Sequence, residues 1–351
     1  MSENSILIAM SGGVDSAVAA YLAATGRMAA GVTMQILSDG VGDPLCAKED
    51  ICGAAHVCEK LGIPHYIADV GAVFRQTVVD PFIAAYQSGE TPNPCVFCNK
   101  SVKFGALLDF AAQHGFQNIA TGHYVRMETD SSGRVLLRRA DDTTKDQTYM
   151  LWSLTQDVLS RCEFPLGSLS KSEARTIAAA QGFPMAQRKD SQDICFVPDG
   201  DYAAFITRIT GCVPQPGDFI DAKGRTLGKH KGQIHYTIGQ RKGLGIALGK
   251  PAFVTAKCAQ TNTVTLGENQ DLFSKRLVAK DCNFILFDRL QAPMRLLAKA
   301  RYRQEAAPAR VEQTEEGTLV VEFDTPQRAI CKGQSLVLYQ DDYLVGGGII
   351  C

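Results

Sequence analysis

The sequence predicts an α/β protein: a parallel sheet with helices on both faces, followed by a small central region and a C-terminal β-rich region. Over roughly the first 120 residues, strand-like apolar runs alternate with amphipathic helical patterns, an order typical of parallel sheets. After about Val197 the helical period is lost and closely spaced Gly and Pro residues separate short segments. From about Leu272, β-rich runs between turn residues fit a small antiparallel barrel or sandwich. We therefore expect domains at residues 1–200, 201–271 and 272–351.

The individual elements of the N-terminal domain follow from the same alternation. Strands are expected at residues 6–10, 29–34, 66–69 and 118–121, and helices at 17–25, 52–61, 73–88 and 104–114. In the C-terminal domain, the β-rich runs include residues 319–323 and 335–339. Because ligands of such sheets bind at the carboxyl ends of the strands, site residues are expected directly after them.

Composition excludes several classes of protein. The 351 residues are 45% hydrophobic and 21% charged, which excludes disorder, collagen and coiled coil as the main architecture. The apolar run at 6–10 is too short for a signal peptide or a membrane span, so we expect a cytoplasmic protein with no membrane partner. The 12 cysteines are about 3% of the chain, below the density of secreted disulfide frameworks, and most should be reduced thiols.

Charge is segregated along the chain. The window from Lys223 to Lys250 carries seven basic residues and no acid, and Arg295 to Arg310 carries five basic residues and one acid. Residues 311–351 carry seven acids and two basic residues. The basic windows indicate either a solvated face or a binding site for a polyanion.

A glycine-rich loop follows the first expected strand. Ser11-Gly12-Gly13-Val14-Asp15-Ser16 leads directly into a helix, so backbone N–H groups, the helix N-terminus and two hydroxyls can face a phosphate. The Asp15 carboxylate would repel that phosphate unless Mg²⁺ lay between them. The alternative is an ordinary capped turn, but the strand before and the helix after favour nucleotide binding. The loop lacks the Gly-Lys-Ser/Thr ending of a Walker motif.

This loop resembles the pyrophosphate loop of the ATP pyrophosphatases, which cleave ATP between the α and β phosphates and adenylate a carbonyl-type oxygen. GMP synthetase, NAD synthetase, argininosuccinate synthetase and tRNA thiolation enzymes share it. The loop by itself does not distinguish among them.

Two cysteine segments add a second chemistry. Cys95 and Cys98 lie three residues apart in a Pro-rich segment that we expect to be a loop, and Cys195 is a further candidate. Lys100, Lys103 and Lys189 are near enough in sequence to lower a thiol pKa. The other cysteines are better explained as small buried or structural side chains: Cys46, Cys52, Cys58, Cys162, Cys212, Cys258, Cys282, Cys331 and Cys351.

With the glycine-rich loop and the two cysteine segments in this order, the chain closely resembles the bacterial and mitochondrial tRNA-specific 2-thiouridylase family over nearly its whole length. The resemblance implies an adenine nucleotide alpha hydrolase-like N-terminal domain, a central tRNA-binding domain and a C-terminal antiparallel β-barrel. The other matching motifs are Gly122-His123-Tyr124, Lys145-Asp146-Gln147, Lys189-Asp190-Ser191, Ile194-Cys195-Phe196, Tyr236 to Gly245, Arg301-Tyr302-Arg303, Gly333-Gln334-Ser335 and Gly346 to Ile350.

The resemblance implies ATP- and Mg²⁺-dependent 2-thiolation of the wobble uridine of tRNA, giving 2-thiouridine, AMP and pyrophosphate. Cys195 would carry the persulfide, Cys98 would be the partner nucleophile, and a cysteine desulfurase or sulfur-relay protein would supply sulfur. The implied ATP-binding residues are Ala9, Met10, Ser11, Gly12, Gly13, Val14, Asp15, Ser16, Met34 and Gly122. The implied tRNA-binding residues are Asn93, Pro94, Cys95, His123, Lys145, Asp146, Gln147, Arg301, Tyr302 and Gln334.

One position departs from the family pattern. Cys95 stands where the family often has an Asp that is commonly assigned to proton handling. Either another group takes that role, or Cys95, Cys98 and Cys195 are ligands of a four-iron four-sulfur cluster with one open iron. Zinc fits less well because a closed site needs a fourth ligand.

The residues alone leave two other functions open. An ATP-dependent amidating synthetase would share the loop without needing paired redox cysteines. An RNA-binding protein with a vestigial loop would bind tRNA without releasing pyrophosphate.

Overall fold

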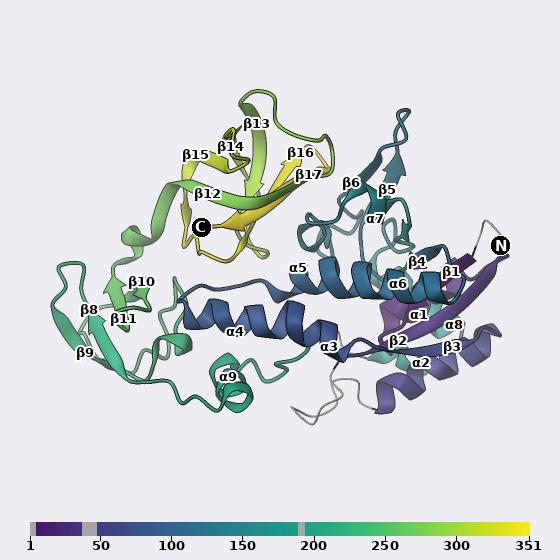
Figure 1. The fold of residues 1–351 in the computed structure, drawn as a ribbon, viewed down its shortest axis with the longest axis horizontal. Helices are drawn as coiled ribbons and strands as arrows, with labels where there is room; N and C mark the ends of the chain where they lie inside the picture. Colours follow the sequence, from purple (N-terminus) through teal and green to yellow (C-terminus); the bar gives the residue numbers. More distant parts are fainter. Residues whose placement is uncertain (1–4, 37–47, 189–193) are drawn as a thin grey trace.

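The computed structural model describes residues 5–36, 48–188 and 194–351, and its N-terminal part is built on a five-stranded parallel sheet (Figure 1). The strand order is β3-β2-β1-β4-β7. The strands are β1 (Ser5–Ala9), β2 (Met28–Gln35), β3 (His65–Asp69), β4 (Asn118–Ala120) and β7 (Cys162–Glu163). The predicted parallel sheet is confirmed.

Helices cover both faces of this sheet because side chains of β1 alternate between two apolar cores. Ile6 and Ile8 pack in one core with α1 (Val14–Ala23), α2 (Lys48–Leu61) and α8 (Lys171–Ala180). Leu7 packs in the other core with α3 (Gly71–Phe74), α4 (Asp80–Gln87) and α6 (Leu107–Gln113).

Two of the expected helices differ from the prediction. The helix expected at 73–88 is continuous from α3 to α4 through the π-helical η1 (Arg75–Val79). The helix expected at 104–114 begins at residue 94, as α5 (Pro94–Cys98), the π-helical η2 (Asn99–Ala106) and α6. The expected loop at Cys95 and Cys98 is therefore wrong. Pro94 stands in the first turn, where its missing N–H leaves no helical hydrogen bond unmade.

The central region forms a second, four-stranded sheet of order β10-β11-β8-β9. Its strands are β8 (Gly217–Ile220), β9 (Thr226–His230), β10 (Phe253–Cys258) and β11 (Thr263–Gly267), with η5 (Gln233–His235) between β9 and β10. A helix precedes it, α9 (Tyr202–Thr210), although no helical period was expected after Val197. The Asp201 carboxylate starts that helix by accepting the Ala204 N–H at 2.9 Å.

The C-terminal region is a closed antiparallel barrel of β12 (Phe273–Phe284), β13 (Met294–Lys299), β14 (Ala307–Gln313), β15 (Leu319–Arg328), β16 (Ser335–Gln340) and β17 (Tyr343–Ile350). Closure follows because β12 pairs with both β15 and β17. Of the two expected architectures, barrel and sandwich, the structure has the barrel.

A hairpin of the N-terminal domain extends the barrel sheet, which the sequence did not predict. β5 (Arg126–Thr129) and β6 (Val135–Arg138) pair with each other, and Arg138 pairs with Tyr343 on β17. The Arg139 N–H donates to the Asp342 carbonyl at 2.9 Å. The remaining short elements are η3 (Thr148–Met150), α7 (Gln156–Leu159), η4 (Pro184–Gln187) and η6 (Asn269–Leu272). Among the described residues, no helix has the length and apolar character needed to cross a membrane.

Candidate active site

The glycine-rich loop connects β1 to α1 and is closed by its own hydroxyls. Ser16 Oγ accepts the Ser11 N–H at 3.1 Å and donates to the Gly13 carbonyl at 3.0 Å. Gly12 has φ +70°, and a Cβ added to it would lie 2.7 Å from Asp50 Cα. Only glycine combines this backbone conformation with so close a neighbour. The loop thus presents a preformed turn at the N-terminus of α1.

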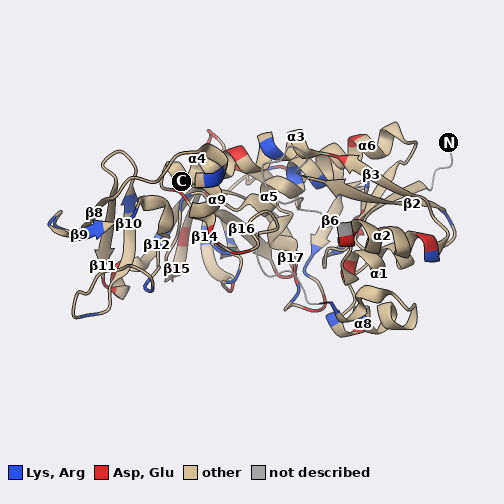
Figure 2. Cartoon of the chain, turned by 90° about the horizontal axis from the view of Figure 1, so that it is seen from below, with Lys and Arg blue, Asp and Glu red and all other residues tan. Residues whose placement is uncertain are grey.

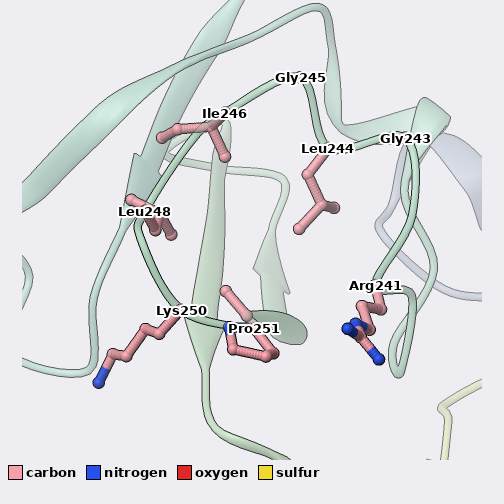
Figure 3. A pocket seen from close by; sticks show the side chains of 9 residues that line it. Arg241, Gly243, Leu244, Gly245, Ile246, Leu248, Lys250 and Pro251 are labelled. Carbon is pink, nitrogen blue, oxygen red and sulfur yellow. The ribbon is translucent and has the colours of Figure 1, made fainter.

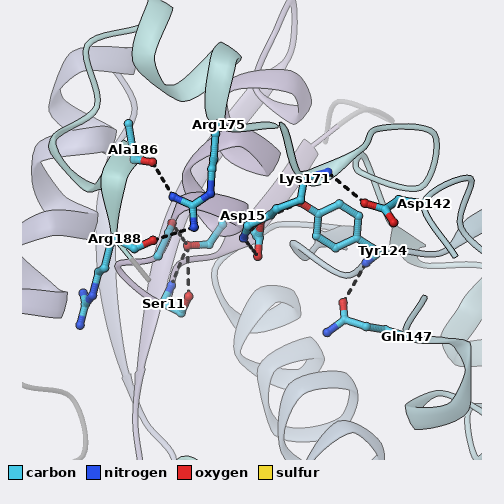
Figure 4. Close-up of polar contacts among 11 residues, drawn as sticks. Ser11, Asp15, Tyr124, Asp142, Gln147, Lys171, Arg175, Ala186 and Arg188 are labelled. Carbon is cyan, nitrogen blue, oxygen red and sulfur yellow. Dashed lines mark hydrogen bonds and ion pairs between the residues drawn. The ribbon is translucent and has the colours of Figure 1, made fainter. Parts of the chain in front are cut away.

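Asp15, in the first turn of α1, is held by two elements from elsewhere in the domain (Figure 4). Its carboxylate accepts hydrogen bonds from Lys171 Nζ at 2.8 and 2.9 Å and from the Tyr124 hydroxyl at 2.8 Å. Lys171 is the first residue of α8, whose start is fixed by a capping box of Ser170 and Glu173. A Cβ added to Gly122 would lie 2.8 Å from the Asp15 carbonyl carbon. Asp15 is therefore fixed in place by charge and by close packing.

Two arginines add positive charge beside the loop. Arg175 on α8 donates to the Ala186 and Arg188 carbonyls, both at 2.8 Å, and so holds the segment after η4 (Figure 4). Arg188 forms an ion pair with Asp50 and reaches the Gly12 carbonyl at 3.4 Å. Sequence reasoning missed Lys171, Arg175 and Arg188, and the only available signal was the Ser170-x-x-Glu173 pattern that starts α8.

The other residues predicted to bind ATP lie at the same edge of the sheet. Ala9 ends β1, and the Met10 N–H donates to the Val32 carbonyl at 2.8 Å. Met34 lies near the end of β2 and Gly122 follows β4. The carboxyl ends of three adjacent strands thus meet at the glycine-rich loop, as expected for a nucleotide site.

The three candidate thiols come together from two segments. Cys95 and Cys98 lie on α5, Cys195 lies in the loop before α9, and each thiol is an electrostatic neighbour of the other two. All three cysteines are free. We refer to Cys95, Cys98 and Cys195 as the thiol site.

Cys95 and Cys98 are partly buried and Cys195 reaches the surface, yet desolvation by the surrounding atoms is the main influence on the pKa of all three thiols. Desolvation raises the pKa of Cys95 and Cys98, and raises the pKa of Cys195 to about 12, whereas the Lys103 ammonium lowers all three by a smaller amount. The expectation of thiols with a lowered pKa is therefore wrong, because the loss of hydration outweighs the nearby positive charge. Lys100 is exposed, and Lys189 lies outside the described residues.

Metal binding was the alternative role expected for these three cysteines. No group of three or more His, Cys, Asp or Glu side chains within residues 5–36, 48–188 and 194–351 could hold a metal ion.

Several residues predicted to contact tRNA gather at the N-terminus of α5. Gln334, in the loop before β16, donates from Nε2 to the Thr91 carbonyl at 2.8 Å. The Tyr302 hydroxyl donates to the Asp146 carbonyl at 3.4 Å, and Asn93 Nδ2 lies 3.6 Å from Met150 Sδ. The structure thus brings segments 91–98, 145–147, 301–302 and 334 together. Pro94 itself is buried and Lys145 is half-buried.

The polar side chains of Asp146 and Gln147 already have partners within the domain. Asp146 Oδ2 accepts the Thr148 hydroxyl at 2.7 Å, and Gln147 Oε1 accepts the Tyr124 N–H at 2.9 Å (Figure 4). These bonds shape the loop on which they lie.

Arg301 and His123 are turned inward. Arg301 Nη2 donates to the Ile238 carbonyl at 3.0 Å and to Cys331 Sγ at 2.7 Å, so its guanidinium joins the barrel to the central domain. His123 is buried, with Nδ1 2.7 Å from Thr121 Oγ1. Burial lowers the pKa of His123 well below its usual value, so this side chain is neutral at pH 7.

The basic window of the central domain is partly neutralised by acids outside it. Arg225 pairs with Asp221 at 2.6 Å, Lys229 with Asp218 at 2.7 Å and Lys250 with Glu268 at 2.7 Å. Basic residues, blue in Figure 2, lie on β9 and β10. Arg241 lies at the rim of a cavity of about 300 Å³ between residues 241 and 252 (Figure 3). The surface is therefore less positive than the sequence window alone indicates.

Comparison with known proteins agrees with these features along the whole chain. Residues 4–199 match the family described as tRNA methyl transferase HUP domain, 204–268 the tRNA methyl transferase PRC-barrel domain and 274–350 the Aminomethyltransferase beta-barrel domain. A solved NH3-dependent NAD synthetase from Campylobacter jejuni superposes with a TM-score of 0.33 at 19% identity, covering 54% of this chain and 69% of its own.

Full-length relatives are more similar. The tRNA-specific 2-thiouridylase MnmA of Lachnoclostridium phytofermentans is 46% identical over 98% of this chain and 99% of its own. The protein of the same name from Clostridioides difficile is 46% identical over 98% and 97%, and that from Acetivibrio thermocellus is 46% identical over 100% of each chain. With its glycine-rich loop, its thiol site and these full-length matches, the chain belongs to the tRNA-specific 2-thiouridylase family.

Proposed function

We propose that this protein is a tRNA sulfurtransferase that converts the wobble uridine to 2-thiouridine, using ATP and a cysteine persulfide. One observation carries the proposal: the segment after β4 connects the two chemical sites. Gly122 packs against Asp15 of the glycine-rich loop, and the next residue, His123, is an electrostatic neighbour of Lys103, which faces the thiol site. The two sites thus adjoin the same segment, which supports activation by ATP and sulfur transfer at one uridine.

The first step is adenylation of the uridine. The 2-carbonyl of a stacked base is out of reach, so the uridine is flipped out of the anticodon loop. Its oxygen attacks the α-phosphate of ATP, and pyrophosphate leaves. The backbone N–H groups of the glycine-rich loop and the hydroxyl of Ser11 hold the phosphates, and Lys171 and Arg188 offset their charge.

Mg²⁺ fits the same loop. The Asp15 side chain is 34% exposed at the N-terminus of α1, where a carboxylate oxygen is a suitable ligand for a hard cation. The ion would be held by Asp15 and the phosphates, and it would supply charge neutralisation for the departing pyrophosphate.

The second step moves sulfur. The terminal sulfur of the Cys195 persulfide attacks C2 of the adenylated uridine, and AMP leaves. The Cys98 thiolate attacks the sulfur that stays on Cys195, so the persulfide S–S bond breaks and a Cys98–Cys195 disulfide forms. The transferred sulfur gains the two electrons that the two cysteines lose. An external reductant then reopens the disulfide, and a cysteine desulfurase or sulfur-relay protein reloads Cys195.

Cys95 has no assigned proton role in this scheme. Its thiol is half-buried and burial raises its pKa, so it is a neutral side chain beside the target base. We favour a redox pair of Cys98 and Cys195 over an iron–sulfur cluster, because the sulfur-transfer steps above need one persulfide and one further thiol. Anaerobic analysis of the purified protein should therefore show no stoichiometric iron or sulfide.

The remaining assignments follow from this scheme. We propose a catalytic domain at 1–200, a tRNA-binding domain at 201–271 and a barrel domain at 272–351. Because the substrate is tRNA, we expect the enzyme to act in the cytoplasm.

The function is tested by anaerobic thiolation of unmodified tRNA with ATP, Mg²⁺ and a persulfide source, scored by mass spectrometry of nucleosides. Wild type should form 2-thiouridine, and Cys195→Ser should not; Cys95→Ser reports whether that thiol takes part. Pyrophosphate release with an amine acceptor and no thiolation would instead indicate an amidating synthetase. Binding of tRNA without pyrophosphate release would indicate a non-catalytic RNA-binding protein.

The central domain makes a separate prediction about tRNA binding. Arg241→Gln with Lys242→Gln should weaken binding about tenfold. The slope of log affinity against log salt should fall by about 0.7–0.9 for each phosphate that is no longer neutralised. Arg225→Gln is the matched control, because Arg225 is already paired with Asp221. Equal affinities and salt slopes in all variants would identify the basic window as a solvated face.

A further inference from the structure

The helix that carries Cys95 and Cys98 changes its winding directly after Cys98. Residues 99–106 form the π-helical η2, which continues α5 without a break (Figure 1). A π-helix bonds residues five apart, so its turn is wider than an α-helical turn and brings residues i and i+5 closer to one face. Lys103 is the fifth residue after Cys98. With α-helical winding the two side chains would diverge by about 140°, at 100° per residue. The π-helical winding thus turns Lys103 toward the thiols.

The surroundings of Lys103 agree with this placement. Its ammonium is an electrostatic neighbour of Cys95 and Cys98 on its own helix, of Cys195 in the loop before α9 and of His123 after β4. His123 is neutral, and it contacts the ring of Phe104, the next residue of η2, at 5.7 Å between centroids. The other groups that face the thiol site are the Tyr302 hydroxyl, beside Cys95, and the backbone of Phe196, beside Cys195. Among these groups, Lys103 carries the positive charge.

We propose that Lys103 is a positioning residue for sulfur transfer: its ammonium, brought to the thiol face by the π-helical turn, stabilises the anionic sulfur of Cys98 and of the Cys195 persulfide. This inference rests on the proposed function and adds to it the group that offsets the cost of a partly desolvated sulfur anion. Desolvation disfavours the thiolate, which is the reactive form, and one nearby cation compensates in part. The charge acts throughout the reaction, and Lys103 itself forms and breaks no bond.

The test is alkylation of individual cysteines, which requires neither tRNA nor ATP. The full-length protein is treated with iodoacetamide from pH 6.5 to 9.5, and the rate at each cysteine is read by peptide mass spectrometry. Lys103→Met should slow alkylation of Cys98 and Cys195 about tenfold at pH 8, because a tenfold smaller thiolate fraction corresponds to a pKa higher by one unit. Both rates should be lower by a similar factor at each pH of this range, which lies below the raised pKa of Cys195, and Lys103→Arg should restore most of the rate.

Lys100→Met is the control, because Lys100 is an exposed lysine on the same π-helical segment. It should leave both profiles unchanged. Equal profiles for wild type and Lys103→Met, or equal shifts in Lys103→Met and Lys100→Met, would overturn the proposal. Cys58 and Cys162 are buried elsewhere and report on folding. If Lys103→Met and also Lys103→Gln made these two reactive, Lys103 would be a structural residue and the proposal would fail.

Each outcome remains interpretable if the thiolation assay fails. Absence of 2-thiouridine formation by the wild type would refute the function, whereas unchanged alkylation profiles would refute only the role of Lys103.

Discussion

The glycine-rich loop and the thiol site are built in opposite ways. The loop consists of consecutive residues, and it is closed on itself because Ser16 Oγ accepts the Ser11 N–H and donates to the Gly13 carbonyl. The thiol site draws on α5, on the loop before α9 and on a lysine that reaches it through a π-helical turn. The first site is fixed by local sequence, whereas the second depends on long-range packing. The chemistry of the second should therefore be the more easily disturbed.

Substitution of the redox cysteines should give the largest effect and separate the two sites. Cys195→Ser should reduce 2-thiouridine formation at least about 1,000-fold, because no sulfur is carried to the uridine, as is usual when a covalent nucleophile is removed. Release of pyrophosphate on tRNA should continue, measured in a single turnover. Cys212→Ser, at an exposed cysteine, serves as the control. Loss of pyrophosphate release in Cys195→Ser would mean that the two sites are not independent.

Neutralising Asp15 tests the glycine-rich loop, the other of the two sites compared. Asp15→Asn should lower kcat/KM for ATP about 100-fold, equivalent to about 2.7 kcal/mol, because the loop loses its anionic oxygen and the negative charge that Lys171 binds. The alkylation rates of Cys98 and Cys195 should stay the same. A change in those rates would show that the loop also shapes the thiol site.

Adding one methyl group at Gly122, between the glycine-rich loop and His123, should have a smaller effect. It should lower both the stability of the protein and its affinity for ATP. Gly122→Ala places a Cβ 2.8 Å from the Asp15 carbonyl carbon, and overpacking of this kind costs about 1–3 kcal/mol. Thermal melts should show the loss of stability, and the KM for ATP should rise. Gly53→Ala is the matched control, since its nearest neighbour, Met185 Cε, would be 3.5 Å away and the site is helical. Equal melting temperatures for the two variants would contradict the close packing at Gly122.

The smallest expected effect is at Cys162, and it tests whether burial alone raises the pKa of a thiol. Cys162 lies in β7, outside the thiol site, and burial raises its pKa from 9.0 to about 12. Below pH 9 this thiol is protonated in both the folded and the unfolded chain. Between pH 9 and 12 the unfolded chain ionises first, so the free energy of unfolding falls as pH rises, by about 1 kcal/mol between pH 8 and 10. Urea titrations at pH 8 and pH 10 measure this fall in the free energy of unfolding. The contribution of the Cys162 thiol to it should be missing in Cys162→Ala. An unchanged pH dependence in that variant would mean that the Cys162 thiol is not desolvated.

The sequence predicted most of what is local and little of what is long-range. The alternation of strands and helices, the glycine-rich loop and the barrel follow from periodicity and turn residues, and the structure confirms them. The winding around Cys98 could not be predicted, because an apolar period does not distinguish an α-helical turn from a π-helical one. The partners of Asp15 were missed because Lys171 lies 156 residues away in sequence. The raised pKa values were missed because burial is a property of the folded chain.

The β5–β6 hairpin has a consequence for dissecting this protein into fragments. Its outer edge meets the barrel through the Arg138–Tyr343 pairing, the Arg126–Asp342 ion pair and the Tyr343 hydroxyl on Glu128. A shortened chain ending near residue 271 would lose these contacts and the bond from the Arg139 N–H to the Asp342 carbonyl, and it would uncover this edge of the hairpin. The isolated catalytic domain should therefore be more prone to self-association than the full chain, which size-exclusion chromatography of the two would show.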